Sequence, residues 1–313
     1  MKVLVAGATG AIGRQLVPKL VANGHAVAGT TRTPQKQAVL HEGGASAHVL
    51  DLLNADAVTR VVADLEPEVI VHQATALSSV DMRHFDRSFA VTNRLRTEGL
   101  DHLLAAGRAV GVRRFVAQSF AGWPFARTGA RVKTEADALD PNPVAPMRST
   151  VAALRHLEAA VVGAEWTEGI ALRCGGLYGP GTSLDGDGGE MIEMIRRRFF
   201  PIIGSGDGMF SFLHVADAAD ATVLAVERGT RGVYQIVDDE PAPLREWLPV
   251  VAESLGAQRP WRIPLWLGRL VGGAALATIA TEGRGASNEL AKRSLGWTPR
   301  HASWRDSLGR ASA

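Results

Sequence analysis

Short apolar runs alternate with longer amphipathic segments through the first half of the chain. The apolar runs lie at Val3–Gly7, Ala26–Thr31, Ala47–Leu50, Val69–Ala74 and Arg114–Ser119. The segments with helical spacing lie between them, at Ile12–Asn23, Pro34–His41, Ala55–Leu65 and Phe85–Ala109. Short buried strands separated by helices are typical of βαβ units, in which right-handed crossovers place helices on both faces of a parallel sheet. We therefore predict an α/β protein with a doubly wound parallel sheet.

The second half of the chain departs from this alternation. A loop-like stretch over 120–146 precedes a long helix at Arg148–Val162 and a strand at Ile170–Arg173. Beyond Gly175, glycine-rich loops separate short strands and helices. We predict a dinucleotide-binding core of the Rossmann type over 1–173. A smaller C-terminal substrate lobe over 174–313 is expected to be partly interleaved with it.

Composition limits the function classes. The 313 residues are 46% hydrophobic and carry a net charge of +2, with the basic residues spread along the chain, so no nucleic-acid partner is expected.

The first residues enter an apolar strand directly, and the apolar stretch Trp261–Ala280 contains Arg262 and Arg269. A membrane span needs about 20 apolar residues. We therefore predict a cytoplasmic protein with no membrane partner, and the histidine spacing predicts no metal site.

A glycine-rich turn, Gly7-Ala8-Thr9-Gly10-Ala11-Ile12-Gly13, joins the first strand to the first helix. This is the setting that a dinucleotide fingerprint requires. Gly7 permits the tight turn, Gly10 lets the backbone approach a pyrophosphate, and Gly13 allows the helix to pack closely on the strand. The free N–H groups at the helix N-terminus then face the anion. The turn predicts nucleotide binding.

The end of the second strand predicts which dinucleotide is bound. Sites that prefer NAD usually carry an acidic residue here for the ribose 2′-hydroxyl, whereas this strand ends in Thr30-Thr31-Arg32. The Arg32 guanidinium suits a 2′-phosphate, and Lys36 follows on the next helix. We therefore expect NADP(H) to be favoured over NAD(H), with a solvent-exposed arginine as the alternative reading.

Further segments in the same order resemble the extended short-chain dehydrogenase/reductase superfamily, in its NAD-dependent epimerase/dehydratase group. They include Asp51-Leu52, His72–Thr75, Val91–Asn93, Val112–Ser119, Leu172–Gly181, Phe212–Asp217 and Leu295–Pro299. The resemblance implies that Asp51 and Leu52 contact the adenine and that Gln73, Ala74 and Thr75 run along the cofactor. The expected cofactor-binding residues are thus Gly7, Thr9, Gly10, Ala11, Ile12, Gly13, Arg32, Asp51, Leu52, Gln73, Ala74, Thr75 and Asn93.

One departure from this family concerns its proton donor. Members usually carry a Tyr and, four residues later, a Lys on one helix face, and the Tyr exchanges a proton with the substrate oxygen. Aligning on Pro146 puts Met147 and Val151 at these positions, and aligning on Glu158 gives Thr150 and Leu154. The chain has two tyrosines, Tyr178 and Tyr234, and no lysine between Lys133 and Lys292. A non-standard, more apolar active site is predicted.

Several residues are candidates for that site. The family resemblance makes Ser119 a candidate for positioning the substrate oxygen, the alternative being a strand-end serine bonded to the backbone. Trp123, Met147, Val151 and Tyr178 are the candidate substrate-binding residues, although Trp123 and Tyr178 also fit plain loop packing. Phe210 stands where sugar-nucleotide enzymes of the family usually have an arginine, which argues against a nucleotide sugar.

Three functions are compatible with these features. The first is an NAD(P)-dependent oxidoreductase or epimerase-like enzyme acting on a small, rather apolar carbonyl, enol or conjugated substrate. The second is an NADP(H)-binding sensor or scaffold without turnover, and the third is a non-redox isomerase or cyclase that uses the same fold. A homodimer through Phe85–Ala109 and Arg148–Val162 is possible, because members of the family often pair through these two helices.

Overall fold

The computed structural model describes residues 1–77 and 80–308 and is built around one parallel sheet. Within these residues the sheet has seven strands in the order β12-β7-β5-β4-β1-β2-β3, with every pairing parallel. From β1 the chain first adds β2 and β3 on one side and then β4, β5, β7 and β12 on the other, and this reversal of strand order makes the sheet doubly wound. The strands are β1 (Lys2–Ala6), β2 (Ala26–Thr31), β3 (Ser46–Val49), β4 (Val69–His72), β5 (Arg114–Phe120), β7 (Glu168–Cys174) and β12 (Gly232–Ile236).

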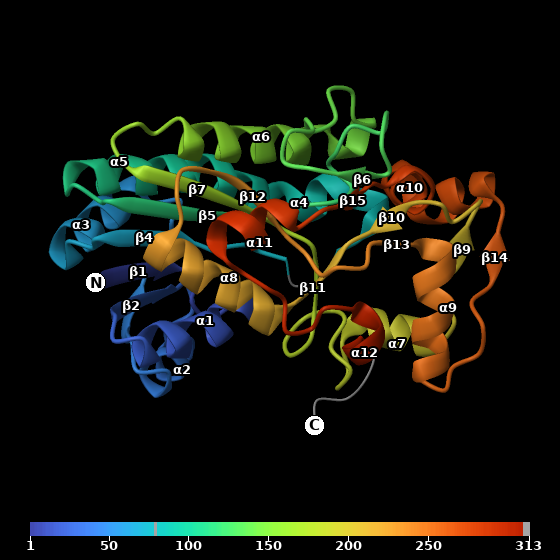
Figure 1. Cartoon of the computed structure of the whole chain (residues 1–313), viewed down its shortest axis with the longest axis horizontal. Coiled ribbons are helices and arrows are strands. Elements are labelled where there is room, and N and C mark those ends of the chain that lie inside the picture. Colours follow the sequence, from blue (N-terminus) through green and yellow to red (C-terminus); the bar gives the residue numbers. More distant parts are fainter. Residues whose placement is uncertain (78–79, 309–313) are drawn as a thin grey trace.

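Helices cover both faces of this sheet, as the sequence predicts (Figure 1). One apolar core lies beneath α1 and α8, and a second lies between the opposite face and α3, α5 and α6. Because both faces are covered, the central strands read as continuous apolar runs such as Val3-Leu4-Val5. The helices of this part are α1 (Ala11–Ala22), α2 (Gln37–Glu42), α3 (Ala55–Leu65), α4 (Phe85–Arg94), α5 (Leu100–Ala109), α6 (Arg148–Val162), α8 (Val215–Arg228) and α11 (Glu289–Leu295).

The C-terminal part of the chain contributes both to the sheet and to a separate core. Strand β12 pairs with β7, and α8 packs against α1. A third apolar cluster, which includes Tyr178, Phe212 and Trp247, belongs to the lobe drawn at the right of Figure 1. The lobe and its connections comprise β6 (Val132–Lys133), β8 (Gly176–Tyr178), α7 (Glu190–Arg196), β9 (Ile202–Ile203), β10 (Met209–Phe210), β11 (Phe212–His214), β13 (Ala242–Pro243), α9 (Leu244–Ser254), β14 (Arg262–Ile263), α10 (Leu265–Glu282), β15 (Gly285–Ala286) and α12 (Trp304–Ser307).

Two predicted elements differ from those observed. The helix expected over Phe85–Ala109 contains a π-helical turn at Leu95–Gly99, which separates α4 from α5. The strand expected to reach Ala74 ends at His72, and the following residues form a loop at the carboxyl edge of the sheet. Among the described residues, no helix has the length and apolarity needed to cross a membrane.

Candidate functional site

The glycine turn has the geometry that the fingerprint predicts. Gly7 has φ +86°, and a Cβ there would lie 2.6 Å from the Ala74 backbone. A Cβ on Gly13 would lie 2.4 Å from the Ala8 carbonyl oxygen, so helix α1 and the turn touch there. Gly10 is exposed, and the nearest atom to a Cβ at this position is the Gly7 carbonyl oxygen at 3.3 Å. The turn is thus closed on its inner side and open on its outer side.

The start of α1 is available to an anion. Gly10 is the N-cap residue, no side chain caps the helix, and the first turn contains no acidic residue. Ile12 is buried beneath the turn, while Ala11 is half-buried. The free N–H groups and the partial positive charge of the helix N-terminus therefore face an open surface at Gly10.

The end of β2 lies beside this turn. The Thr9 and Thr31 hydroxyls are 3.5 Å apart, and the Thr31 hydroxyl also accepts from the Thr33 backbone N–H at 3.1 Å. Arg32 and Lys36 are exposed, and neither forms an ion pair with a described residue. Arg32 thus directly follows Thr31, which contacts Thr9 of the glycine turn, and Lys36 lies four residues further along.

The other predicted cofactor contacts come from the ends of β3 and β4. Leu52 is buried, and its carbonyl accepts from His102 Nδ1 at 2.8 Å, whereas Asp51 is exposed and caps the Leu53 backbone N–H. The Gln73 backbone N–H donates to the Ala6 carbonyl at 2.8 Å, which extends the sheet by one bond.

The segment after β4 continues from this bond. The Gln73 side chain donates to the Thr222 hydroxyl of α8 at 3.3 Å and so points away from the loop. Ala74 packs against Gly7, and Thr75 is exposed. At this edge of the sheet, a bound cofactor would therefore meet the backbone of this segment and not the side-chain amide of Gln73.

Asn93 connects two helices. Its Nδ2 donates to the Thr150 hydroxyl on α6 at 3.1 Å, and its Oδ1 is buried without a hydrogen-bond partner among the described residues. Asn93 is among the expected cofactor-binding residues, and in the structure its side chain links α4 to α6. Asn93 thereby fixes α4 beside the part of α6 that holds Thr150 and Val151.

Three of the four candidate substrate-binding residues meet in one apolar cluster. Met147 and Val151 are buried one helical turn apart, together with Phe85 and Phe89 of α4. The Trp123 ring is half-buried at the edge of this cluster, 5.2 Å from the Phe85 ring centroid. Such edge-to-face pairs of aromatic rings stabilise the wall that they form. We name this set, with Phe120, the aromatic cluster.

Ser119 does not lie in the aromatic cluster. Its hydroxyl donates to Glu158 Oε1 at 2.6 Å, and Arg173 binds the same carboxylate through Nε and Nη2 at 2.8 and 2.7 Å. All three side chains are buried. Glu158 is seven residues beyond Val151 on α6, about 10 Å along the helix axis. The predicted oxygen-positioning role of Ser119 is therefore not supported, because its proton already serves a buried ion pair.

Strand alternation explains this placement and the different position of the next residue, Phe120. Successive side chains of a strand point to opposite faces, so Phe120 points away from the side that Ser119 occupies. Phe120 packs at the edge of the aromatic cluster, with its ring centroid 5.4 Å from that of Trp123. The alternation of side chains along β5 is the sequence pattern that places Ser119 and Phe120 on opposite faces.

Tyr178 belongs to a different cluster. It is buried in the core of the C-terminal lobe, with its ring centroid 5.1 Å from that of His214. Its hydroxyl has no hydrogen-bond partner among the described residues, and burial raises the pKa of this hydroxyl well above its ordinary value. The structure therefore does not place Tyr178 with Met147 and Val151, and the packing interpretation fits it better.

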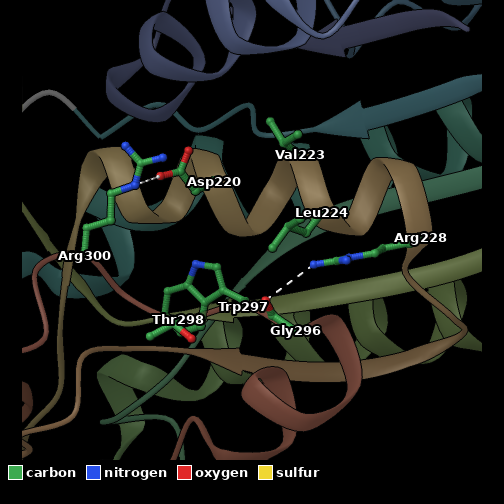
Figure 2. A pocket seen from close by; sticks show the side chains of 8 residues that line it. All are labelled: Asp220, Val223, Leu224, Arg228, Gly296, Trp297, Thr298 and Arg300. Atoms are coloured by element: carbon green, nitrogen blue, oxygen red, sulfur yellow. Dashed lines mark hydrogen bonds and ion pairs between the residues drawn. The ribbon is translucent and has the colours of Figure 1, made fainter.

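One surface pocket lies away from these residues. It has a volume of about 340 Å³ and is lined by residues of α8 and of the chain near Trp297, as drawn in Figure 2. Its polar groups are already paired, since Arg300 contacts Asp220 at 3.3 Å and Arg228 donates to the Gly296 carbonyl at 3.4 Å. No predicted cofactor or substrate residue lines it. This pocket is not the candidate active site.

The carboxyl edge of the sheet is the candidate active site. The glycine turn, the Ala74 loop and the end of β5 all lie at this edge. The first turn of α6 brings Val151 to the aromatic cluster, and Met147 reaches it from the residue just before this helix. The residues present fit a dinucleotide, because the open Gly10 surface and the uncapped α1 suit a pyrophosphate. This arrangement can hold a nicotinamide cofactor beside an apolar, aromatic wall.

Comparisons with known proteins agree with this geometry. The chain is 43% identical over 319 aligned positions to a Streptomyces sp. protein named 3-diazoavenalumate denitrifying reductase, covering 99% of this chain and 100% of that one. It is 27% identical to a Stigmatella aurantiaca protein named 4-hydroxy-2-methyl-3-oxo-4-farnesyl-3,4-dihydroquinoline-1-oxide ketoreductase, over 82% of this chain and 74% of that one. The solved structure of MoeE5 with UDP-glucuronic acid and NAD superposes with a TM-score of 0.74 and 26% identity, covering 99% and 97% of the two chains.

The family itself follows from a match to most of the chain. The family model described as NAD dependent epimerase/dehydratase family matches residues 3–237, which include the glycine turn, β5, α6 and β12. With relatives named as reductases, this match identifies an NAD(P)-dependent enzyme of the oxidoreductase/epimerase type. The chain belongs to the NAD dependent epimerase/dehydratase family.

Proposed function

We propose that this chain is an NADP(H)-dependent reductase that transfers hydride to a small aromatic electrophile without a tyrosine acid. The observation that carries the proposal is the face that α6 presents. When the chain is aligned on Pro146, Met147 and Val151 take the positions of the family's Tyr and Lys, and both are buried in the aromatic cluster. Neither of these two side chains can carry a proton, so in this proposal the chemistry at this wall proceeds without one from either position.

The alternative tyrosines do not supply the missing acid. The Tyr178 hydroxyl is enclosed in the lobe core, and the Tyr234 hydroxyl lies 2.9 Å from the Thr230 hydroxyl on the far side of β7. A reduction that needs hydride alone therefore suits this site better than one that needs hydride and a side-chain proton.

A diazo group on an aromatic ring is such an electrophile. When bound, the reduced cofactor supplies a hydride. In the net reaction, an aryl diazonium takes up that hydride, its C–N bond breaks, a C–H bond forms and N2 leaves. No proton is consumed, whereas reduction of a ketone to an alcohol consumes one. The relative at 43% identity is named as a denitrifying reductase of a diazo compound, which supports this substrate class.

The residues have distinct roles in this proposal. The glycine turn and the Ala74 loop hold the dinucleotide, and Arg32 with Lys36 binds the 2′-phosphate that distinguishes NADP(H). The aromatic cluster stacks on the substrate ring and excludes water, and its ring faces also suit a cationic diazonium. Trp123 and Phe120, which are half-buried, form the accessible part of this wall.

The proposal is tested with the purified full-length chain. NADPH absorbance and N2 release are followed together with a series of aryl diazonium salts, and a matched series of aryl ketones serves for comparison. The proposal predicts one NADPH consumed per N2 released, and slower or no turnover of the ketones. Tight NADPH binding without turnover of either series would support a sensor or scaffold instead. Turnover without NADPH consumption would support a non-redox isomerase or cyclase.

A further inference from the structure

Arg96 is a buried arginine that the proposed mechanism does not yet use. It lies in the π-helical turn between α4 and α5, and only 5% of its surface is exposed. Its Nε and Nη1 are shielded from solvent and have no hydrogen-bond partner among the described residues, and no ion pair to Arg96 is found there either. Arg173, the other strongly buried arginine of this layer, is fully paired with Glu158.

An unpaired buried charge is costly, and this explains why buried arginines are normally paired. Burial lowers the pKa of Arg96 to about 10, so the side chain still carries its charge at neutral pH. The apolar core on this side of the sheet includes Leu95, Leu100 and Leu157, and the described residues supply no carboxylate partner for Arg96. A costly group that contributes nothing to packing is typical of a functional site.

The position of Arg96 connects it to the candidate active site. Asn93, one turn earlier on the same helix face, donates to Thr150, the neighbour of Val151. The 95–99 turn packs against α6, and helical side chains point back toward the helix N-terminus. We therefore expect the guanidinium to lie toward the level of Thr150 and Val151, and its charge acts on the ring of His72 at the end of β4.

Two further buried polar atoms lie at this place. His72, the last residue of β4, donates from Nε2 to the Leu95 carbonyl at 3.0 Å, and its Nδ1 has no partner among the described residues. Burial, with the nearby charge of Arg96, lowers the pKa of His72 to about 4, so this ring is neutral and does not add to the charge. The Asn93 Oδ1 is the second unpartnered atom. Arg96 is therefore the one cation identified in this group.

We infer that Arg96 is a positioning residue of the proposed active site, whose charge makes the site bind the reduced dinucleotide in preference to the oxidised one. This inference rests on the proposed function. The nicotinamide ring is neutral when reduced and cationic when oxidised, so a fixed positive charge near the place where the ring would bind would disfavour only the oxidised form. Because Nε and Nη1 are enclosed, the effect acts through the charge and not through direct contact. Helix α6 contains no lysine, so no lysine charge from this helix acts beside that of Arg96.

The test measures dissociation constants of NADP⁺ and NADPH for the wild type, Arg96→Met, Arg96→Gln and Arg96→Lys. A unit charge about 10 Å away at an effective dielectric near 20 changes the ratio of the two constants roughly tenfold. We expect Arg96→Met and Arg96→Gln to lower Kd(NADP⁺)/Kd(NADPH) by this factor, while Arg96→Lys keeps the wild-type ratio. If the Arg96→Met variant does not fold, the Arg96→Gln variant provides the same test.

Arg114→Met is the matched control. Arg114 is a half-buried arginine at the start of β5, on the opposite edge of the sheet, where its Nη1 donates to the Val226 carbonyl. Its removal should leave the ratio unchanged. A structural role for Arg96 would weaken both forms of the cofactor equally, and an unchanged ratio in the Met and Gln variants overturns the inference. If the wild type binds neither form, the proposed function fails, and the inference falls with it.

Discussion

The two later glycines of the phosphate-binding turn allow cofactor binding to be separated from folding. Gly10 adopts φ −74° and ψ 175°, which any residue tolerates, and a Cβ there meets only the Gly7 carbonyl oxygen at 3.3 Å. A Cβ on Gly13 would lie within 2.4–2.6 Å of three backbone atoms of Ala8 and Gly7. Gly10→Ala therefore adds a methyl group to the open surface, whereas Gly13→Ala drives helix α1 away from the turn.

Gly10→Ala should mainly weaken NADPH binding, whereas Gly13→Ala should mainly lower the stability of the fold. Gly10→Ala replaces a tolerated N-cap residue with a poor one, which costs up to about 1 kcal/mol and lowers Tm by about 2 °C. The methyl group blocks the backbone approach to the pyrophosphate, and losing one charge-assisted hydrogen bond weakens NADPH binding about tenfold to a hundredfold. Gly13→Ala overpacks rigid backbone, costs about 3 kcal/mol and lowers Tm by about 6 °C.

The assay is a fluorescence titration of NADPH paired with thermal unfolding of each variant without cofactor. The expected pattern is a Gly10→Ala protein that melts almost as the wild type does but binds poorly, and a Gly13→Ala protein that is defective in both. If Gly10→Ala binds NADPH within about twofold of the wild type while folded, the cofactor does not lie on this turn and the reasoning is refuted.

Three further predictions follow from individual contacts. Arg32→Asp should weaken NADPH relative to NADH about tenfold or more, and an unchanged ratio of the two dissociation constants would remove the assignment of Arg32 to the 2′-phosphate. Ser119→Ala should lower the free energy of unfolding, measured in urea, by about 1–3 kcal/mol, because Glu158 loses a buried donor. The kcat of this variant should stay within about twofold of the wild type. A variant that keeps full stability but loses turnover would show that Ser119 is catalytic after all. Burial raises the pKa of Asp238 to about 8, so the fold favours its protonated form, and this contribution is present at low pH and lost as pH rises through 8. Asp238→Asn should therefore flatten the fall of stability between about pH 4 and pH 8, and an unchanged slope would contradict the shift.

Much of the core could be predicted from the sequence, because burial on both faces leaves a direct signal. The strand predicted at Ala26–Thr31 and the helix predicted at Arg148–Val162 have the observed bounds. The glycine turn has the predicted close approaches at Gly7 and Gly13, since these depend on local backbone geometry. The π-helical turn at Leu95–Gly99 was not predicted, because one extra residue in a helix barely changes the apolar spacing.

The candidate site was harder to predict, because it depends on which way side chains point. Ser119 and Phe120 are neighbours in sequence, yet one bonds the buried Glu158 and the other packs at the aromatic cluster. Tyr178 follows a family-like segment but is enclosed by the lobe core, a long-range contact that no local pattern encodes. Arg96 reads as an ordinary helix-surface arginine, and only the packing of its turn against α6 shows that it is buried.

The central claim, hydride transfer without a tyrosine acid, is tested most directly in a tyrosine-free protein. The chain has two tyrosines. Tyr178→Phe removes a hydroxyl with no hydrogen-bond partner among the described residues, whereas Tyr234→Phe removes the hydrogen bonds to Thr230, so the double variant is first shown to fold. The measurement is kcat/KM for NADPH-dependent N2 release from an aryl diazonium salt by this double variant. The account predicts a value within about threefold of the wild type, and a loss of a hundredfold or more in a protein that still folds and binds NADPH would contradict it.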